Sequence, residues 1–264
     1  MPEGHTIRRK VVDQAPHLVG HRLRASSPSG RFAPGAAAID GRVLETIDAW
    51  GKHLFYFFGG RRVLHVHLGM DGRYRHHRLP PERVPPPRRT VALRVTAPGM
   101  TFDLSSPKVC QVIDVVHQRR IVGNLGPDPL RPDADSDAVL PRLAAYDGPI
   151  GVALLDQSLI AGIGNVYRAE ILFALGIHPE RAAATITREE WSSLWDTSVR
   201  MLEAGVRDRG EIITVDPRDF KVRDRRSTYV YGQRICAHCG FPVRHWDLQG
   251  REAWACENCQ PLSR

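Results

Sequence analysis

The chain has 264 residues, 42% of them hydrophobic, which is enough for one large domain or two to three smaller ones with real cores. Its 37 Lys and Arg outnumber its 29 Asp and Glu, and the net charge of +8 favours a polyanionic partner such as nucleic acid. No apolar run approaches the roughly 18 residues of a membrane span and no secretory signal is visible, so we expect a cytoplasmic protein with no membrane segment.

The chain begins Met-Pro-Glu-Gly, and residues 5–18 then follow a helical pattern. Ile7, Val11 and Leu18 recur on one stripe, which predicts an amphipathic helix. Taken alone, Pro2 would only start this helix, because proline suits a first turn and chain ends are usually frayed.

Residues 20–122 are predicted to form an antiparallel β-sandwich or barrel, because short β-rich runs end there in Gly, Pro or Ser. The predicted strands cover 42–51, 52–58, 62–69, 90–99, 100–105 and 109–115. Between them, residues 78–89 contain five prolines, which predicts an exposed, extended loop.

A segment rich in Gly, Pro and Asp at 123–137 indicates a hinge between two domains. Beyond it, apolar periodicity predicts helices over 140–146, 151–160, 165–176 and 187–206, and the chain then returns to loops and short strands over 210–234. We therefore predict four parts: an N-terminal sandwich domain (1–125), a hinge (126–137), a helical domain (138–225) and a cysteine-rich end (226–264).

Two of the predicted helices are joined by Ala-Gly-Ile-Gly at 161–164. Gly162 and Gly164 permit a tight turn, and Asn165 is placed to cap the second helix. Free backbone N–H groups at such a turn would bind an anion such as phosphate. A plain corner between two helices explains the spacing equally well.

Four of the five cysteines form two Cys-x-x-Cys pairs separated by sixteen residues: Cys236, Cys239, Cys256 and Cys259. This spacing suits one tetrahedral zinc ion with a structural role, since four protein ligands leave no open position. The metal would also supply the folding energy of so small a hairpin. The alternatives are a redox pair or free thiols. Arg251 in the intervening loop is either a phosphate clamp or a solvated arginine.

Three of these features together closely resemble the formamidopyrimidine-DNA glycosylase / endonuclease VIII family of base-excision repair enzymes: the initial Pro-Glu-Gly, the Gly-Ile-Gly-Asn helix pair and the four-cysteine finger. The resemblance extends to WGKHL (50–54), HLGM (67–70), NLGPDPL (124–130) and LLDQSLIAGIGN (154–165), in the same order. Gly4 is typical of the endonuclease VIII branch, of the actinobacterial type, because the other branch usually begins Pro-Glu-Leu-Pro-Glu.

The resemblance implies an α+β fold, in which an N-terminal β-sandwich flanked by helices is followed by a helix–two-turn–helix domain with a C-terminal zinc-finger β-hairpin. It implies a bifunctional DNA glycosylase and abasic-site lyase that removes oxidised bases, with pyrimidines favoured, and then acts by β- and δ-elimination. The expected partner is damaged DNA, double-stranded and also single-stranded. We expect a monomer with one structural zinc, associated with the bacterial nucleoid.

The resemblance also implies three catalytic residues. Pro2, the N-terminal amine once Met1 is removed, is the nucleophile, Glu3 is its acid/base partner, and Lys52 contacts phosphate and assists the chemistry. An α-amine titrates near pH 8 and a lysine near about 10.4, so the chain end holds on the order of a hundredfold more free amine at neutral pH.

Three DNA-binding residues follow from the same resemblance. Asn165 and Arg251 clamp the phosphates around the flipped nucleotide, and Met70 is the candidate that fills the space left by the base. Residues 105–112 lack the Arg–Phe pair of the formamidopyrimidine branch, which predicts weak discrimination of the opposite base and activity on single-stranded or bubble DNA.

Two rival functions remain from the sequence. A non-enzymatic DNA-binding zinc protein explains the charge, the finger and the helix pair, but it leaves Pro2 and Glu3 unexplained. A tautomerase that uses an N-terminal proline as its base fits less well, because such enzymes are short repeated units without zinc.

Overall fold

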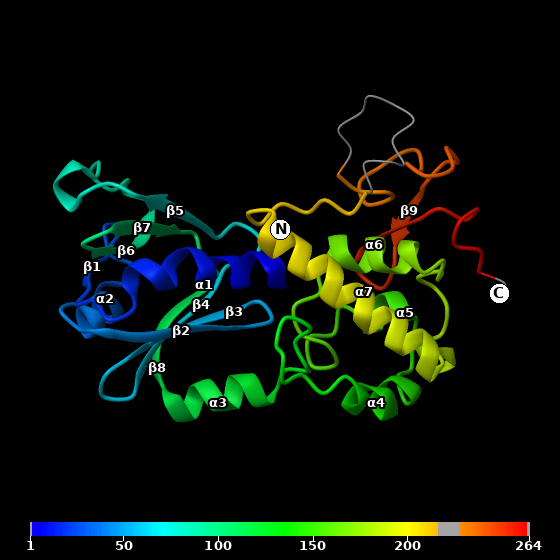
Figure 1. The fold of residues 1–264 in the computed structure, drawn as a ribbon, viewed down its shortest axis with the longest axis horizontal. Helices are drawn as coiled ribbons and strands as arrows, with labels where there is room; N and C mark the ends of the chain where they lie inside the picture. Colours follow the sequence, from blue (N-terminus) through cyan, green and yellow to red (C-terminus); the bar gives the residue numbers. More distant parts are fainter. Residues whose placement is uncertain (1, 216–226, 263–264) are drawn as a thin grey trace. The chain divides into compact units, whose positions relative to one another are not determined.

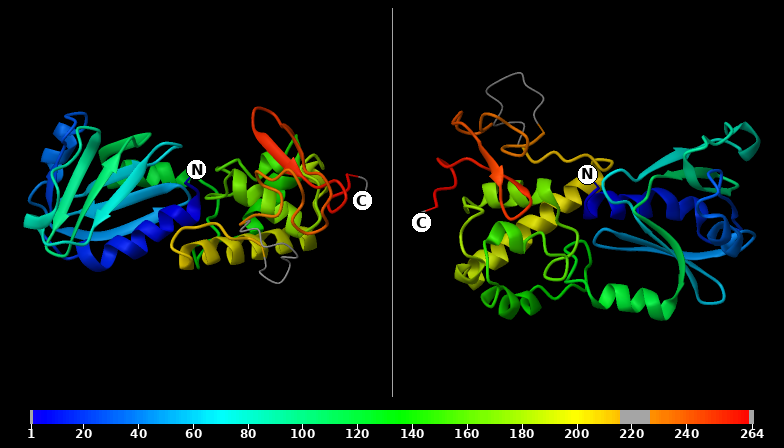
Figure 2. Two further views of the ribbon diagram at one scale, coloured as in Figure 1. Left: turned by 90° about the horizontal axis from the view of Figure 1, so that it is seen from above. Right: turned by 180° about the vertical axis from the view of Figure 1, so that it is seen from behind.

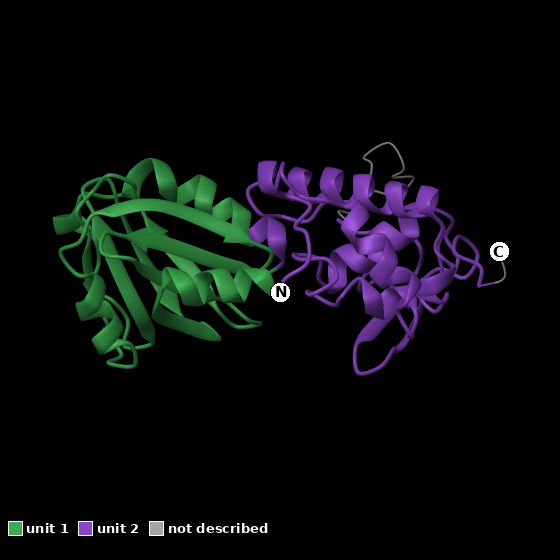
Figure 3. Cartoon of the chain, turned by 90° about the horizontal axis from the view of Figure 1, so that it is seen from below, with its two compact units in different colours: residues 1–2, 7–124 green, residues 3–6, 125–264 purple. Residues whose placement is uncertain are grey.

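The computed structural model describes residues 2–215 and 227–262, which form two compact units (Figure 3). Unit 1 contains residues 1–2 and 7–124, and unit 2 contains residues 3–6 and 125–264. The expected removal of Met1 and the predicted domain boundary at 225–226 lie outside the described residues.

Unit 1 is a sandwich of two four-stranded antiparallel sheets (Figures 1 and 2), which confirms the predicted sandwich. One sheet has the order β1 (Arg24–Ser26), β6 (Val91–Ala97), β7 (Met100–Ser105), β5 (Arg73–His77). The other has the order β2 (Leu44–Trp50), β3 (His53–Phe58), β4 (Arg62–His67), β8 (Val109–Asp114). The sequence analysis did not predict β1 and β5, because β1 is only three residues long and β5 consists mostly of arginine and histidine.

Apolar side chains from both sheets form the core of unit 1, since alternate residues of each strand point to the same face. Tyr56 of β3 stacks on Phe102 of β7, with ring centroids 6.0 Å apart. The Tyr56 hydroxyl donates to Gln14 Oε1 at 2.7 Å, so this buried polar group is satisfied inside the core.

Three helices accompany the sandwich: α1 (Gly4–Leu18), α2 (Ala33–Ile39) and α3 (Val115–Gly123). The predicted N-terminal helix is confirmed, whereas α2 and α3 were not predicted. The α2 segment APGAAAI is seven residues long and has Pro34 and Gly35 in its first turn, a pair typical of turns. At α3, the side chain of Asp114 accepts the His117 N–H at 2.7 Å and caps a helix directly after a strand.

Unit 2 contains α4 (Leu140–Ala144), α5 (Ile150–Ala153), α6 (Asn165–Ala174) and α7 (Arg188–Arg207), with the short 3₁₀ turns η2 (Asp137–Val139) and η3 (Ala183–Thr185). Their apolar faces meet around buried side chains such as Leu172 of α6 and Trp191 of α7.

In unit 1, η1 (Pro81–Arg83) lies within the predicted proline-rich loop. No helix in the described parts of the chain is long and apolar enough to cross a membrane.

The helix predicted over 151–160 is wrong beyond Ala153, where α5 ends. Asp156 Oδ1 accepts the backbone N–H of Ser158 at 2.8 Å and its hydroxyl at 2.7 Å, and this local turn competes with a continuing helix. The described parts of 210–234, residues 210–215 and 227–234, contain no strand. The hairpin of β9 (Arg244–Asp247) and β10 (Glu252–Ala255) follows.

Candidate active site

The carboxylate of Glu3 caps the start of α6, and Glu3 is fully buried. Its oxygens accept the backbone N–H groups of Gly164 at 2.8 Å, Val166 at 2.8 Å and Tyr167 at 3.4 Å. The first N–H groups of a helix have no partner within the helix, and they lie at the positive end of its dipole. The anion predicted for this turn is therefore a carboxylate of the chain itself.

Gly164 makes this close approach possible. A Cβ atom at this position would lie 2.4 Å from Glu3 Cδ, far inside any contact distance. The prediction that Asn165 caps the helix is wrong, because Gly164 is the N-cap residue, makes no side-chain cap and leaves that role to Glu3. Asn165 is the first residue of α6.

The side chain of Asn165 instead joins α6 to the C-terminal hairpin. Its Nδ2 donates to the carbonyl oxygen of Glu252 at 3.1 Å, and Arg168 Nη2 donates to the same oxygen. Arg251 directly precedes this carbonyl and is exposed in the turn that connects β9 to β10. The structure thus brings Asn165 and Arg251, two of the predicted DNA-binding residues, to one region of unit 2.

The sequence analysis missed Arg168, which is only 1% exposed. Its Nη1 also donates to the carbonyl oxygen of Gly151 at 3.2 Å. Burial lowers the pKa of Arg168 to about 10, and the nearby Glu3 carboxylate opposes this shift, so the guanidinium stays charged at neutral pH. A charged residue within the apolar run NVYRAEILF was the available signal for such a buried role.

Glu170 in the same helix was missed as well. It accepts the hydroxyl of Thr214 at 2.6 Å and the N–H groups of Tyr229, Val230 and Tyr231 at 2.8, 3.0 and 2.9 Å. Burial raises the pKa of Glu170, and these donors act against that shift. Glu170 therefore holds two segments of unit 2 that are distant in sequence against α6.

In unit 1, Lys52 lies at the tip of the β2–β3 hairpin, in a two-residue turn between the paired residues Trp50 and His53. Its charge helps to lower the pKa values of His53 and His67, for both of which burial is the main cause. A hairpin tip is where a cation reaches solvent and an anionic ligand most easily.

Next to this turn, three uncharged side chains are linked by hydrogen bonds, and the sequence analysis missed this group as well. His53 Nδ1 is 2.9 Å from His65 Nε2, and His65 Nδ1 is 3.3 Å from Gln111 Nε2. Because the Gln111 amide nitrogen donates, His65 accepts through Nδ1 and donates to His53 through Nε2. Burial lowers the pKa of His53 to about 3 and that of His65 to about 4, so both rings are neutral at pH 7.

The two remaining predicted residues lie in unit 1. Met70 is 73% exposed in the turn between β4 and β5, so it is not a core methionine. Pro2 is half-buried and immediately precedes Glu3 in the chain.

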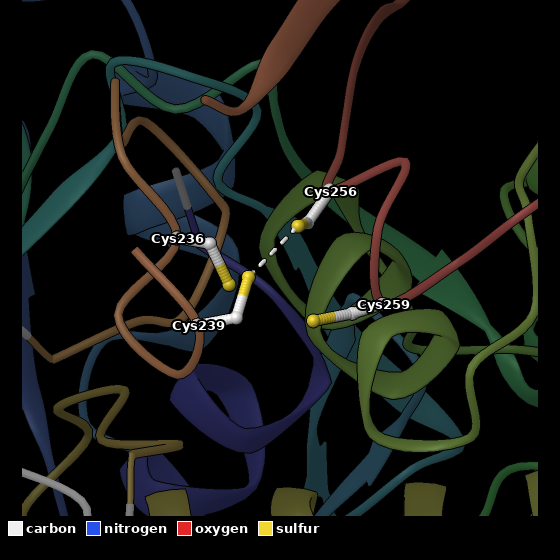
Figure 4. A group of neighbouring side chains, drawn as sticks. All are labelled: Cys236, Cys239, Cys256 and Cys259. Carbon is white, nitrogen blue, oxygen red and sulfur yellow. Dashed lines mark hydrogen bonds between the residues drawn. The ribbon is translucent and has the colours of Figure 1, made fainter. Parts of the chain in front are cut away.

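The four clustered cysteines lie on either side of the β9–β10 hairpin, and Figure 4 shows their side chains converging. Their sulfur atoms all lie within 4.8 Å of one another, and Cys239 Sγ and Cys256 Sγ are 3.5 Å apart. One four-coordinate metal ion can span this spacing. Cys110, the fifth cysteine, lies in β8 and packs against the core of unit 1.

Comparisons with known proteins cover nearly the whole chain. Residues 1–115 match the model of the formamidopyrimidine-DNA glycosylase N-terminal domain, and residues 125–216 match that of the formamidopyrimidine-DNA glycosylase H2TH domain. "Endonuclease 8 1" of Mycobacterium tuberculosis is 40% identical over 268 residues, covering 98% of this chain and all of that protein. "Probable endonuclease 8 2" of Streptomyces coelicolor is 33% identical over 273 residues, covering 98% of this chain and 94% of that protein.

Solved structures share the fold. A complex between the Lactococcus lactis Fpg and DNA containing an abasic site superposes with a TM-score of 0.78 at 22% identity, covering 98% of this chain and 99% of that one. These matches confirm the predicted order of a sandwich, a helical domain and a cysteine-bearing hairpin.

Proposed function

The chain belongs to the formamidopyrimidine-DNA glycosylase family, and we propose that it is a bifunctional DNA glycosylase and abasic-site lyase of base-excision repair. Its substrate is double-stranded DNA that carries an oxidised base, with pyrimidines preferred, and also single-stranded DNA. It acts as a monomer in the bacterial cytoplasm, associated with the nucleoid.

The capping of α6 by Glu3 is the observation that carries this proposal. The residue that follows the N-terminal proline holds a buried carboxylate in a fixed place through three backbone donors. Such donors and the positive helix end stabilise a negative charge. A fixed carboxylate beside an amine nucleophile can move protons at the sugar and stabilise the cation that forms there.

The reaction begins when the free amine of Pro2 attacks C1′ of the damaged nucleotide. The bond between C1′ and the base breaks, and the base leaves with its electron pair and takes up a proton. The proton that the Pro2 nitrogen still carries after the attack passes to the Glu3 carboxylate, which delivers it to the ring oxygen. The sugar ring opens as the freed nitrogen lone pair forms an iminium ion between Pro2 and C1′. The iminium acidifies the C2′ proton, whose loss expels the 3′ phosphate, and a second elimination expels the 5′ phosphate.

Lys52, Asn165 and Arg251 hold the DNA backbone while the base is outside the helix. The exposed position of Arg251, beside the carbonyl that Asn165 and Arg168 bind, supports this role. Met70 enters the space that the base leaves, and its 73% exposure suits a side chain that packs only against a ligand.

Cys236, Cys239, Cys256 and Cys259 hold one zinc ion. Four converging thiols are the donor set of a closed structural zinc site, and among the described residues no further His, Cys, Asp or Glu joins this group. When bound, the ion fixes the ends of the β9–β10 hairpin and takes no part in the chemical steps.

Borohydride trapping tests the proposal. The protein without Met1 is mixed with DNA that carries one abasic site or one thymine glycol, and borohydride then reduces any iminium to a stable adduct that is seen on a denaturing gel. We expect an adduct with the natural protein and a loss of at least about tenfold with Pro2→Gly. A His21→Gln variant, changed at an exposed histidine, is the control and should behave like the natural protein.

The absence of an adduct, together with tight DNA binding, would instead favour the rival function of a DNA-binding protein. The lesion preference is tested separately, with 8-oxoguanine opposite cytosine against thymine glycol in the same duplex. Equal excision rates would contradict the preference for pyrimidines but leave the glycosylase proposal in place.

A further inference from the structure

The side chain of His5 is buried beside the segment that carries the nucleophile, and we propose that His5 is a positioning residue for the Pro2–Glu3 peptide. The inference rests on the proposed function, because it assigns His5 a part in placing the amine that attacks the sugar. His5 acts through Thr6 and the backbone and does not touch the substrate.

The imidazole of His5 is 1% exposed and is fixed from two sides. Its Nε2 lies 3.1 Å from the carbonyl oxygen of Gly210 and 3.1 Å from Thr6 Oγ1. A carbonyl oxygen can only accept, so Nε2 carries the ring proton and shares it between these two oxygens. The tautomer of His5 is thereby set by the Gly210 carbonyl, three residues beyond the end of α7, and by the hydroxyl of the neighbouring Thr6.

The space around the ring fits an imidazole closely. The His5 ring packs edge-on against Tyr167, with centroids 5.0 Å apart and planes at 79°. On the α7 side, a Cβ atom at Gly205 would lie 2.8 Å from His5 Cδ2 and 2.3 Å from the Tyr167 hydroxyl. The ring therefore has little freedom to turn away from Gly210 and Thr6.

Thr6 passes this constraint to the reacting end of the chain. Its Oγ1 accepts the backbone N–H of Glu3 at 3.4 Å, a weak hydrogen bond whose strength depends on where the hydroxyl is held. The adjacent Gly4 N–H donates to the Gly162 carbonyl oxygen at 2.8 Å. Residues 3–6 are assigned to unit 2 by their contacts, while the sandwich residues from Ile7 onward belong to unit 1.

The amide nitrogen of Glu3 is bonded to the carbonyl carbon of Pro2, and the peptide group is planar. A restraint on the direction of the Glu3 N–H therefore also restrains the plane from which the Pro2 ring and its amine extend. Attack on C1′ needs the amine within a few tenths of an ångström of its productive position, and a misplacement of about 1 Å can cost a hundredfold in rate. His5 and Thr6 thus contribute to the rate of iminium formation rather than to DNA affinity.

The experiment compares three variants with the natural protein and with His21→Gln as the exposed-histidine control. His5→Phe keeps a ring but removes the donor, His5→Gln keeps a donor on a similar reach, and Thr6→Val removes the hydroxyl alone. For each protein, we measure the single-turnover rate constant of borohydride trapping on DNA with a preformed abasic site. We also measure the Kd for DNA with a tetrahydrofuran abasic analogue and the Tm.

We expect His5→Phe and Thr6→Val to lower the trapping rate constant about tenfold with less than about twofold change in Kd. His5→Gln should recover most of that rate. A folded His5→Phe protein that traps at the natural rate would refute the inference, and so would losses of rate, affinity and Tm that fall together without rescue by His5→Gln. If the natural protein itself forms no adduct, the proposed function fails, whatever the variants do.

Discussion

Two oppositely charged side chains, Glu3 and Arg168, make backbone hydrogen bonds at the start of α6. Glu3 accepts the first N–H groups of the helix, while Arg168, one turn further on, donates to carbonyl oxygens of Gly151 and Glu252. The two charges neutralise each other in part, since Glu3 opposes the lowering of the Arg168 pKa by burial. Truncating either residue would remove part of the electrostatic compensation of the other's buried charge, while the backbone hydrogen bonds of each would remain.

The variant Gly164→Ala should displace the Glu3 carboxylate without unfolding α6, and so test the role of its position in the reaction. The new Cβ would lie 2.4 Å from Glu3 Cδ, so the carboxylate must leave the helix end while the rest of α6 can persist. We expect the rate constant of borohydride trapping to fall at least about tenfold. Gly123→Ala is the matched control, because nothing lies within 4 Å of a Cβ at that position and the natural rate should remain. A Gly164→Ala protein with unchanged trapping would mean that the position of Glu3 does not matter.

Met70→Ala tests a side chain that is largely exposed and contributes little to packing in the free protein. Because Met70 is 73% exposed, its truncation should change the free energy of unfolding by less than about 0.5 kcal/mol. If Met70 fills the space left by a flipped base, excision from duplex DNA should slow several-fold, while excision from single-stranded DNA should change little. Equal slowing on both substrates would contradict the role in filling the duplex, and urea unfolding checks the stability.

Residues of this kind differ in how far the sequence predicts them. Pro2 and Glu3 stand out because the chain end is an unusual place for them, and the cysteine pairs have a spacing that few other functions need. The cap of α6 was assigned wrongly to Asn165, since local spacing favours the nearest polar residue. The true cap comes from a residue 161 positions away, and no local pattern contains that information.

At the scale of elements, the outer face of the β3–β4–β8 sheet carries the His53–His65–Gln111 chain. Both histidines have pKa values well below their ordinary 6.5, because burial disfavours the charged ring. In the window between pH 6.5 and the folded pKa values of about 4 and 3, the unfolded chain binds more protons than the folded one. The stability contributed by these two neutral rings is therefore present above pH 6.5 and is lost as the pH falls towards their folded pKa values.

This predicts that the natural protein loses stability between pH 6.5 and about pH 5, by on the order of 1 kcal/mol for each of the two histidines. The double variant His53→Leu/His65→Leu should show a distinctly smaller loss over the same range. Urea unfolding at both pH values measures it, with His21→Gln as the control. Parallel losses in the natural protein and the double variant would mean that the two rings do not govern the acid sensitivity.

Elements with strong patterns were predicted well, and the failures share a physical cause. The strands β2, β3, β4, β6, β7 and β8 follow apolar runs that end in turn residues, so local preference and packing agree there. The helix α5 ends early because Asp156 bonds to Ser158 within an otherwise apolar run. The helix α3 begins after a strand because one carboxylate caps it. In both cases side-chain hydrogen bonds set where the helix begins or ends, and the periodicity of apolar residues contains no information about such bonds.

At the scale of the whole molecule, the two units should respond differently to loss of metal. We expect about one zinc per chain by elemental analysis, and chelation should unfold the β9–β10 hairpin because four thiols hold its ends. Trp254, now 8% exposed beside Cys256, should become solvated and shift its fluorescence to longer wavelength. Hydrogen exchange in the sandwich strands of unit 1 should stay slow.

Cysteine variants provide the control for this prediction. Cys239→Ser should lose the zinc and most DNA affinity, whereas Cys110→Ser, in the sandwich, should keep both. Retention of a full equivalent of zinc by Cys239→Ser would place the ion elsewhere.

Residues 3–6 belong by their contacts to unit 2, although they precede all of unit 1 except its first two residues. During synthesis, Glu3 leaves the ribosome 161 residues before Gly164, its partner. At roughly 5 to 20 residues per second, the chain end waits on the order of 10 to 30 seconds without its capping site. The sandwich can fold in that interval, but the Glu3 carboxylate next to Pro2 does not yet have the helix end that holds it. If Pro2 is the nucleophile proposed above, a nascent or truncated chain without the second unit lacks the fixed carboxylate that the reaction needs, and we expect no trapped adduct from it.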